Sequence, residues 1–125
     1  MNISKSNLSK KVESLVPSIL TLDEILTPNV NAAHMRDQIS RSATSVGANL
    51  AEASRSQSYK DYIHKIHVAD KEASETDYWL RMFKAVSIID DEVAFKRLCN
   101  DWSKVVAVFE EIADADPNMY DHHND

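Results

Sequence analysis

The sequence is poor in the residues that interrupt helices. Its 125 residues include one glycine and three prolines, so few positions can form the tight turns on which β-rich folds depend. No run of about 20 apolar residues could span a bilayer, and residues 1–20 alternate polar and apolar side chains without the apolar core of a secretory signal. We therefore expect a soluble, untargeted, all-α domain with a single core.

Cysteine and catalytic motifs are equally scarce. The single cysteine, Cys99, cannot close an intramolecular disulfide or contribute to a cysteine zinc pair, which favours a reducing cytoplasm as the setting. One glycine cannot make a Gly-rich phosphate loop, and no histidine near Cys99 suggests a nucleophile pair. No glutamate is followed three residues later by histidine, as di-iron bundles require. The prediction is a protein without catalytic activity, cofactor or metal.

Basic residues are missing from the end of the chain. The formal net charge is −6, and residues 110–125 contain six acids but no lysine or arginine, so residues 1–109 are neutral overall. A neutral body lacks the general attraction to phosphate backbones that supports nonspecific nucleic-acid binding. The sequence predicts a bundle domain over residues 1–116 and an acidic flexible tail over residues 117–125, and it disfavours direct nucleic-acid binding by one protomer.

Apolar residues recur in four segments at the mean spacing of 3.5 residues that is typical of helices packed along one another. The segments are 8–26, 35–53, 59–83 and 95–112. Pro17 predicts a kink or a division in the first segment, and Thr27 before Pro28 predicts its end. Gly47, inside the second, is expected to serve close helix packing. Short joints favour antiparallel neighbours, so we predict an all-α, antiparallel up-down-up-down four-helix bundle.

Two helix starts carry capping residues. Ser58 is followed three residues later by Asp61, which resembles a capping box with aspartate in the acidic position. The run from Asp90 to Glu92 supplies a cap and acids for the positive end of the fourth helix. These residues predict that the third helix begins just after Ser58 and that the fourth begins within or just after the run from Asp90 to Glu92.

The third and fourth segments have apolar residues beside their main stripes. A wider apolar face either serves the bundle core or forms an interface between copies of the chain. The residues that would form such an oligomer interface are Trp79, Met82, Val86, Cys99 and Val106.

Polar residues line one flank of the second helix and the facing flank of the third. They are Arg41, Ser45, Asn49 and Glu52 on the second helix, and Glu72 and Glu75 on the third. We interpret them as a hydrogen-bonded polar seam that fixes the register of helices or subunits, because semi-buried polar groups need partners. The alternatives are acid–base chemistry by Glu52 with Glu72, and a weak metal face formed by His64 and His67 with Asp70 a further turn along.

Positive side chains gather in the middle of the chain, where residues 31–60 have a net charge of +2. Such charges usually form a solvated face. In a ring of identical copies, however, they would repeat and could bind nucleic acid through avidity. The candidate nucleic-acid contacts are Arg36, Arg41, Arg55, Lys60, Lys65 and Lys71.

Two segments carry a family resemblance. Residues 41–52, RSATSVGANLAE, and residues 71–80, KEASETDYWL, resemble the second and third helices of bacterial four-helix bundle proteins found within intervening sequences of large-subunit ribosomal RNA genes. The resemblance implies a ring-like homopentamer, and the six residues of the predicted polar seam match positions that recur in that family. A related branch is the accessory variability determinant of diversity-generating retroelements, a pentameric barrel that binds a reverse transcriptase and RNA.

The sequence and the resemblance together favour a non-catalytic, homopentameric helical adaptor or scaffold that binds a protein or ribonucleoprotein partner in the cytoplasm. The alternative is a nucleic-acid-binding accessory protein of a diversity-generating retroelement that partners a reverse transcriptase. The retroelement proteins are strongly basic, whereas this chain has a neutral bundle and an acidic end. That difference leaves protein partnering open and weakens the expectation of direct nucleic-acid binding.

Overall fold

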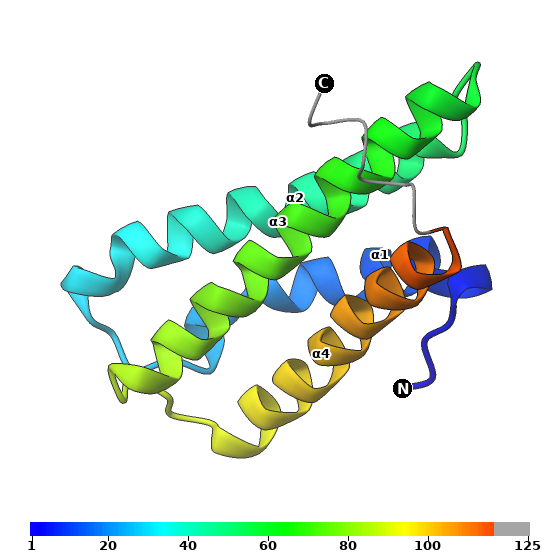
Figure 1. Ribbon diagram of the computed structural model, residues 1–125. Coiled ribbons are helices and arrows are strands. Elements are labelled where there is room, and N and C mark those ends of the chain that lie inside the picture. The colour runs from blue at the N-terminus through cyan, green and yellow to red at the C-terminus, as the bar shows by residue number, and fades with distance from the viewer. Residues whose placement is uncertain (117–125) are drawn as a thin grey trace.

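The computed structural model describes residues 1–116 and confirms the predicted all-α four-helix bundle (Figure 1). The helices are α1 (Leu8–Leu20), α2 (Ala33–Ala53), α3 (Tyr59–Ala85) and α4 (Glu92–Ala115). Short 3-10 turns cover Lys5–Asn7, Leu22–Glu24 and Val30–Ala32. The predicted acidic tail, residues 117–125, lies outside the described residues.

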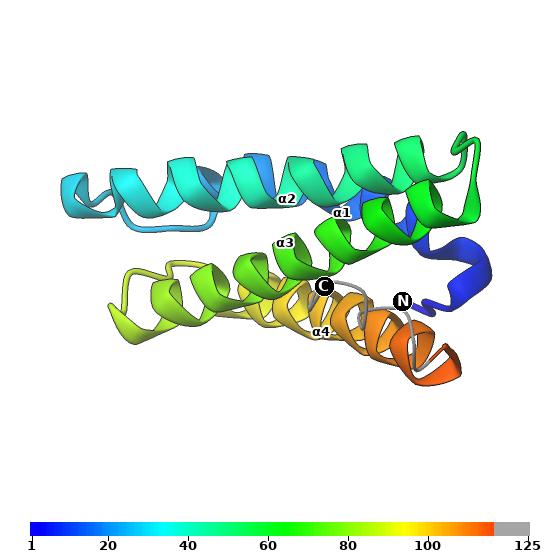
Figure 2. The ribbon, with the colours of Figure 1, turned by 45° about the horizontal axis from the view of Figure 1, so that its top comes forward.

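Consecutive helices are neighbours around the bundle, and α1 closes it against α4. Figure 2 shows α1 behind α2 and α4 below α3, so α3 lies diagonally across the bundle from α1. In the part of the chain that the structure describes, no helix is long and apolar enough to cross a membrane.

The first helix is shorter than predicted. It runs through Pro17 and ends at Leu20, and the N–H and the hydroxyl of Thr21, the next residue, both donate to the carbonyl oxygen of Pro17, at 3.1 and 2.9 Å. The prediction that the first helix extends to Leu26 was therefore wrong, and the predicted division into two shorter segments falls after Leu20 rather than at Pro17. Leu22 and Leu26 are nevertheless buried, since the chain after α1 stays against the core through a 3-10 turn.

The links at one end of the bundle are joined by main-chain hydrogen bonds. Thr27 N donates to Ile88 O at 2.7 Å, and the N–H groups of Asp90 and Asp91 both donate to Ile25 O, at 2.9 and 3.1 Å. These bonds connect the α1–α2 link to the α3–α4 link, with Leu26 and Ile89 forming an isolated bridge. We call this arrangement the link clasp.

The apolar stripes meet in one core. On α3 the predicted stripe is buried from Ile66 to Phe83, but its first two members, Tyr59 and Tyr62, are 66% and 37% exposed, and Ile63 is buried in their place. A straight helix drifts by about 20° per heptad from a 3.5-residue repeat, which accounts for the displaced end. Trp102 of α4 is completely buried, and its indole N–H donates to the carbonyl oxygen of Ala73 at 3.0 Å.

Both predicted caps are present. The hydroxyl of Ser58 accepts a hydrogen bond from Asp61 N at 3.1 Å, and a carboxylate oxygen of Asp91 accepts one from Ala94 N at 3.0 Å. Each side chain satisfies an N–H group that the first turn of a helix leaves without an internal partner. The starts of α3 and α4 are thus set by local sequence.

Gly47 is not required for close packing, contrary to the prediction. A Cβ atom at this position would lie 3.8 Å from Cγ1 of Val12, an ordinary van der Waals contact. Since glycine in a helix interior is less favourable than alanine by roughly 0.5–1 kcal/mol, Gly47→Ala is expected to raise the free energy of unfolding by about that amount. Urea denaturation measures the change. The control Ala48→Gly, at the exposed neighbouring position, should lower stability by a similar amount, and a Gly47→Ala variant less stable than wild type would contradict the packing described here.

Candidate functional site: the polar seam between α2 and α3

The polar seam lies where α2 and α3 run antiparallel, and a pair of buried hydroxyl groups marks its inner edge. Ser42 and Thr76 are completely buried, and their hydroxyl oxygens are 2.7 Å apart. Thr76 is also 2.9 Å from the carbonyl oxygen of Glu72, and Ser42 is 3.2 Å from that of Ile39. One hydroxyl donates to the other while the second donates to its own helix, so neither buried group is left unsatisfied.

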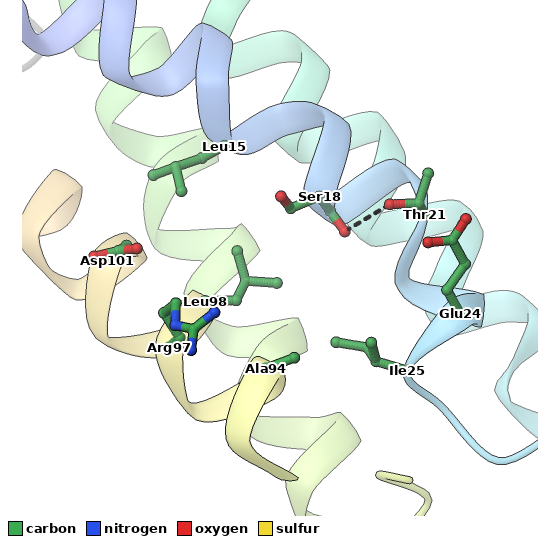
Figure 3. A pocket seen from close by; sticks show the side chains of 9 residues that line it. All are labelled: Leu15, Ser18, Thr21, Glu24, Ile25, Ala94, Arg97, Leu98 and Asp101. Carbon is green, nitrogen blue, oxygen red and sulfur yellow. Dashed lines mark hydrogen bonds between the residues drawn. The ribbon is translucent and has the colours of Figure 1, made fainter. Parts of the chain in front are cut away.

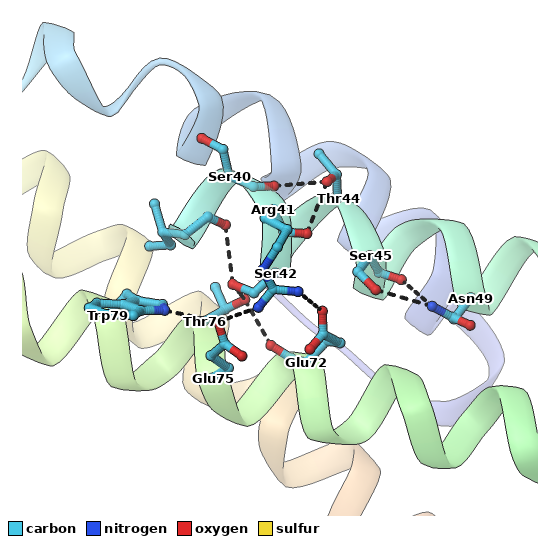
Figure 4. A network of polar contacts seen from close by, with 11 residues as sticks. Ser40, Arg41, Ser42, Thr44, Ser45, Asn49, Glu72, Glu75, Thr76 and Trp79 are labelled. Carbon is cyan, nitrogen blue, oxygen red and sulfur yellow. Dashed lines mark hydrogen bonds and ion pairs between the residues drawn. The ribbon is translucent and has the colours of Figure 1, made fainter. Parts of the chain in front are cut away.

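Arg41 joins the two helices at the outer edge of the seam (Figure 4). Its Nη1 donates to Oε2 of Glu72 at 2.7 Å, and its Nη2 donates to Oε2 of Glu75. The same Glu75 oxygen accepts a hydrogen bond from the indole N–H of Trp79 at 3.0 Å. The hydrogen bonds that Arg41 donates to Glu75 and Glu72 raise the pKa of Arg41, so this guanidinium stays charged and holds both carboxylates.

The other predicted members of the seam pair differently. Nδ2 of Asn49 donates to the carbonyl and hydroxyl oxygens of Ser45, at 2.9 and 3.2 Å, within α2. Glu52 accepts from Nζ of Lys65 at 2.8 Å, across to α3. Lys65 is seven residues from Glu72, which corresponds to about 10 Å along α3. The two carboxylates considered for acid–base chemistry therefore belong to different ion pairs at different levels of the bundle.

The contribution of the polar seam to stability depends on the ionisation of Glu75. The hydrogen bond from Trp79, followed by that from Arg41, lowers the pKa of Glu75 below its usual 4.5 despite burial, which acts in the opposite direction. Because the unfolded state then binds this proton more readily, the stabilising contribution is complete above about pH 4.5 and is lost as the pH falls through the lowered value. Glu75→Gln should therefore show a shallower loss of stability than wild type between about pH 5 and pH 3, measured by urea denaturation.

A second variant isolates the indole contribution. Trp79→Phe keeps an aromatic ring but removes the N–H donor to Glu75, so its stability should also depend less on acid than that of the wild type. If both variants lost stability with the same acid profile as the wild type, Glu75 would not be the group responsible.

The predicted interface residues, on α3, just after it and on α4, do not share one environment. Trp79 packs edge-on against His34 of α2, with ring centroids 6.0 Å apart. Cys99 instead lines a groove of about 480 Å³ between α3 and α4, beside Leu80 and Lys84, where burial raises the pKa of its thiol. The remaining three differ in exposure: Val86 is 49% exposed, whereas Met82 and Val106 are partly buried.

The predicted basic residues do not form one free surface. Arg36 pairs with Asp23 of the Leu22–Glu24 turn at 2.8 Å, while Arg41 and Lys65 are held by the glutamates of the seam. Arg55, Lys60 and Lys71 are exposed. Three of the six side chains thus remain directed at solvent.

The two histidines considered as a metal face differ in exposure. His64 is exposed and His67 is partly buried on α3. Within residues 1–116, no group of three or more histidine, cysteine, aspartate or glutamate side chains is arranged to hold a metal ion.

A cleft of about 240 Å³ between α1 and α4 was not predicted from the sequence (Figure 3). Apolar side chains of Leu15, Ile25 and Leu98 point into it, and the rim is polar. The rim residues are Ser18, Thr21, Glu24, Arg97 and Asp101. The cleft is enclosed by α1, α4 and the turn that follows Leu20, and no spacing in the sequence indicates where that turn begins.

Comparison with known proteins gives the family. The sequence pattern of the 23S rRNA-intervening sequence protein family matches residues 4–110. A protein of unknown function from the S23 ribosomal protein family of Bacteroides thetaiotaomicron, whose crystal structure is known, is 32% identical and superposes with a TM-score of 0.73. That similarity covers 84% of this chain and 96% of the other.

No curated protein matches the chain. The family match nevertheless spans most of the bundle, from before α1 to the last two turns of α4. The resemblance carried by the second and third helices is thereby confirmed, and the chain belongs to the 23S rRNA-intervening sequence protein family.

Proposed function

We propose that the protein is a non-catalytic, homo-oligomeric helical adaptor that binds a protein or ribonucleoprotein partner. The observation that carries this proposal is the outer face of α3, which presents the residue types enriched in protein–protein interfaces, namely aromatic residues, methionine and arginine. Tyr78 is 42% exposed, with the guanidinium of Arg81 5.8 Å from its ring centroid. Trp79 and Met82 lie beside it and are only partly buried.

The polar seam supports an architectural role. Arg41, Glu72 and Glu75 bind one another, and Glu52 binds Lys65, so these groups satisfy each other across two helices. Such pairing fixes the register of α2 against α3 and holds Trp79 in place on the outer face. A homopentamer is the assembly that the resemblance implies, and we propose it for this chain.

Light scattering coupled to size exclusion tests the proposal. A chain of 14.1 kDa is expected to elute at micromolar concentration with a mass of about 70 kDa as a pentamer. A mass near 14.1 kDa under these conditions would remove the adaptor proposal, and a smaller oligomer would remove the pentamer alone.

A second candidate function has one specific observation in its favour. At the start of α3, Tyr59 and Tyr62 are exposed and stacked, with ring centroids 6.3 Å apart; in the sequence, Arg55 precedes them and Lys60 lies between them. Stacked aromatic rings beside cations suit a single-stranded nucleic acid. We therefore retain an RNA-binding accessory role with a reverse transcriptase as the alternative.

RNA retention at about 50 mM salt, where counterion release is most favourable, tests this alternative. Replacing Arg55 and Lys60 by alanine should weaken binding and flatten its salt dependence, whereas replacing Lys5 and Lys10, near the other end of the chain, should not. Absence of binding by the wild type at this salt concentration would exclude the role.

A further inference from the structure

The cleft between α1 and α4 has the properties of a socket for an aromatic side chain. The floor of the cleft is apolar and its rim is polar (Figure 3). Ser18 on α1 and Thr21, directly after α1, lie on one side of the rim, and Arg97 of α4 lies on the other. Its volume is about 240 Å³. An apolar cavity of about 150 Å³ can hold a benzene ring, so the cleft has room for the ring of a tyrosine and for its hydroxyl near the rim.

Tyr78 has the properties of the matching anchor. It lies two residues from both Thr76 and Leu80, which are buried, and this spacing places its side chain about 200° around α3 from the core. Tyrosine and arginine are frequent hot-spot residues in interfaces, and Arg81 lies directly beside the Tyr78 ring.

The charges around the anchor and the cleft are complementary. Tyr78 stands between Asp77 and Arg81, which are 3.2 Å apart as a pair one turn along α3. The cleft has Glu24 on one side and Arg97 on the other. Within residues 1–116 neither of these has an ion-pair partner, whereas Asp101 already faces the N-terminal amino group at 3.6 Å. An incoming Arg81 can therefore meet Glu24 while Asp77 meets Arg97.

The anchor and the cleft also lie at the same height along the bundle. Asp77 and Leu80 of α3 share a groove with Cys99 and Asn100 of α4. The cleft uses the same stretch of α4, from Ala94 to Asp101. A closed ring requires that each copy be rotated relative to the last without being shifted along the ring axis. Two different surfaces at one height, one on α3 and one between α1 and α4, can join copies in this way.

We infer that Tyr78 of one copy inserts into the α1–α4 cleft of the next copy, in a head-to-tail contact repeated around a ring. This inference rests on the proposed homo-oligomer and identifies the surfaces that form it. The cleft is not diametrically opposite Tyr78, because α4, which forms one wall, is adjacent to α3. Each copy is therefore rotated relative to the last, and a head-to-tail contact of this kind forms a ring when successive rotations add up to a full turn.

Complementary variants test the contact. Tyr78→Asp removes the anchor, and Ser18→Trp fills the cleft from an exposed position on α1. Each variant alone should be monomeric at 14.1 kDa by light scattering. An equimolar mixture should form dimers of about 28 kDa, because one intact anchor and one intact cleft remain. The matched control Tyr62→Asp changes another exposed tyrosine of α3 and should retain the wild-type mass, and circular dichroism confirms that each variant is folded.

Two kinds of failure are distinguishable. A monomeric wild type would overturn the proposed oligomer and this contact with it. A multimeric wild type whose mass is unchanged by either variant would overturn the contact alone. Monomeric single variants that do not recombine into dimers would show that the two surfaces do not bind each other, and this outcome also overturns the inference.

Discussion

Trp102→Ala is expected to lower the free energy of unfolding by about 3–5 kcal/mol. The side chain is completely buried in the middle of α4, so its removal takes apolar surface out of the core and leaves a cavity among the helices. It also removes the hydrogen bond to the carbonyl oxygen of Ala73. Because domains of this size have a total stability of about 5–15 kcal/mol, the urea midpoint should fall steeply.

The control Trp102→Phe separates packing from hydrogen bonding. It keeps most of the buried aromatic surface and loses the indole N–H, so its cost should be well below that of alanine. Equal losses for the two variants would mean that the hydrogen bond to Ala73, rather than the packing of the ring, holds α3 against α4.

Leu22→Ala is expected to cost about 2–5 kcal/mol, which is typical of a leucine truncated in a core. Leu22 is 2% exposed in the short turn after α1, whereas Leu20, two residues earlier, is 51% exposed. Leu20→Ala should therefore change stability by no more than about 0.5 kcal/mol. Both are measured by urea denaturation on otherwise identical chains.

The sequence pattern and the structure agree on this pair. Leu22 lies on the apolar stripe of the first segment and Leu20 does not, and the structure buries only Leu22. A large loss for Leu20→Ala together with a small one for Leu22→Ala would contradict the packing of the turn after α1 against the core.

The number, type and direction of the helices follow from the sequence because burial in a bundle imposes a strict period. Ile39 to Ala53 on α2 and Ile66 to Phe83 on α3 are buried at the expected spacings, and Ser58 and Asp91 cap the expected starts. The end of α1 could not be predicted in this way. The apolar stripe continues through Leu22 and Leu26, which are both buried, so its spacing gives no sign that the helix has ended.

The sequence predicted most residues of the candidate site, but only some of the hydrogen-bond and ion-pair partners that they have in the structure. Helical spacing places Arg41, Glu72 and Glu75 on facing flanks, and the structure pairs them. The partner of Glu52 depends on the axial offset of two antiparallel helices, which the sequence does not state. Thr76 belonged to the buried stripe, and a buried hydroxyl needs a partner. That requirement was the one available signal for Ser42, which the sequence analysis did not single out.

The link clasp gives the bundle unequal ends. The main-chain N–H groups of Thr27, Asp90 and Asp91 donate to carbonyl oxygens of the other link, so these amide hydrogens can exchange with water only when the two links separate. At the opposite pole, the start of α3 after the α2–α3 turn is held to the end of α4 by a side-chain hydrogen bond, from the hydroxyl of Tyr59 to Asp116. Transient opening should consequently begin around Ser54 to Tyr62 and spread toward the clasp, which makes the latter the slowest-exchanging loop region of the molecule.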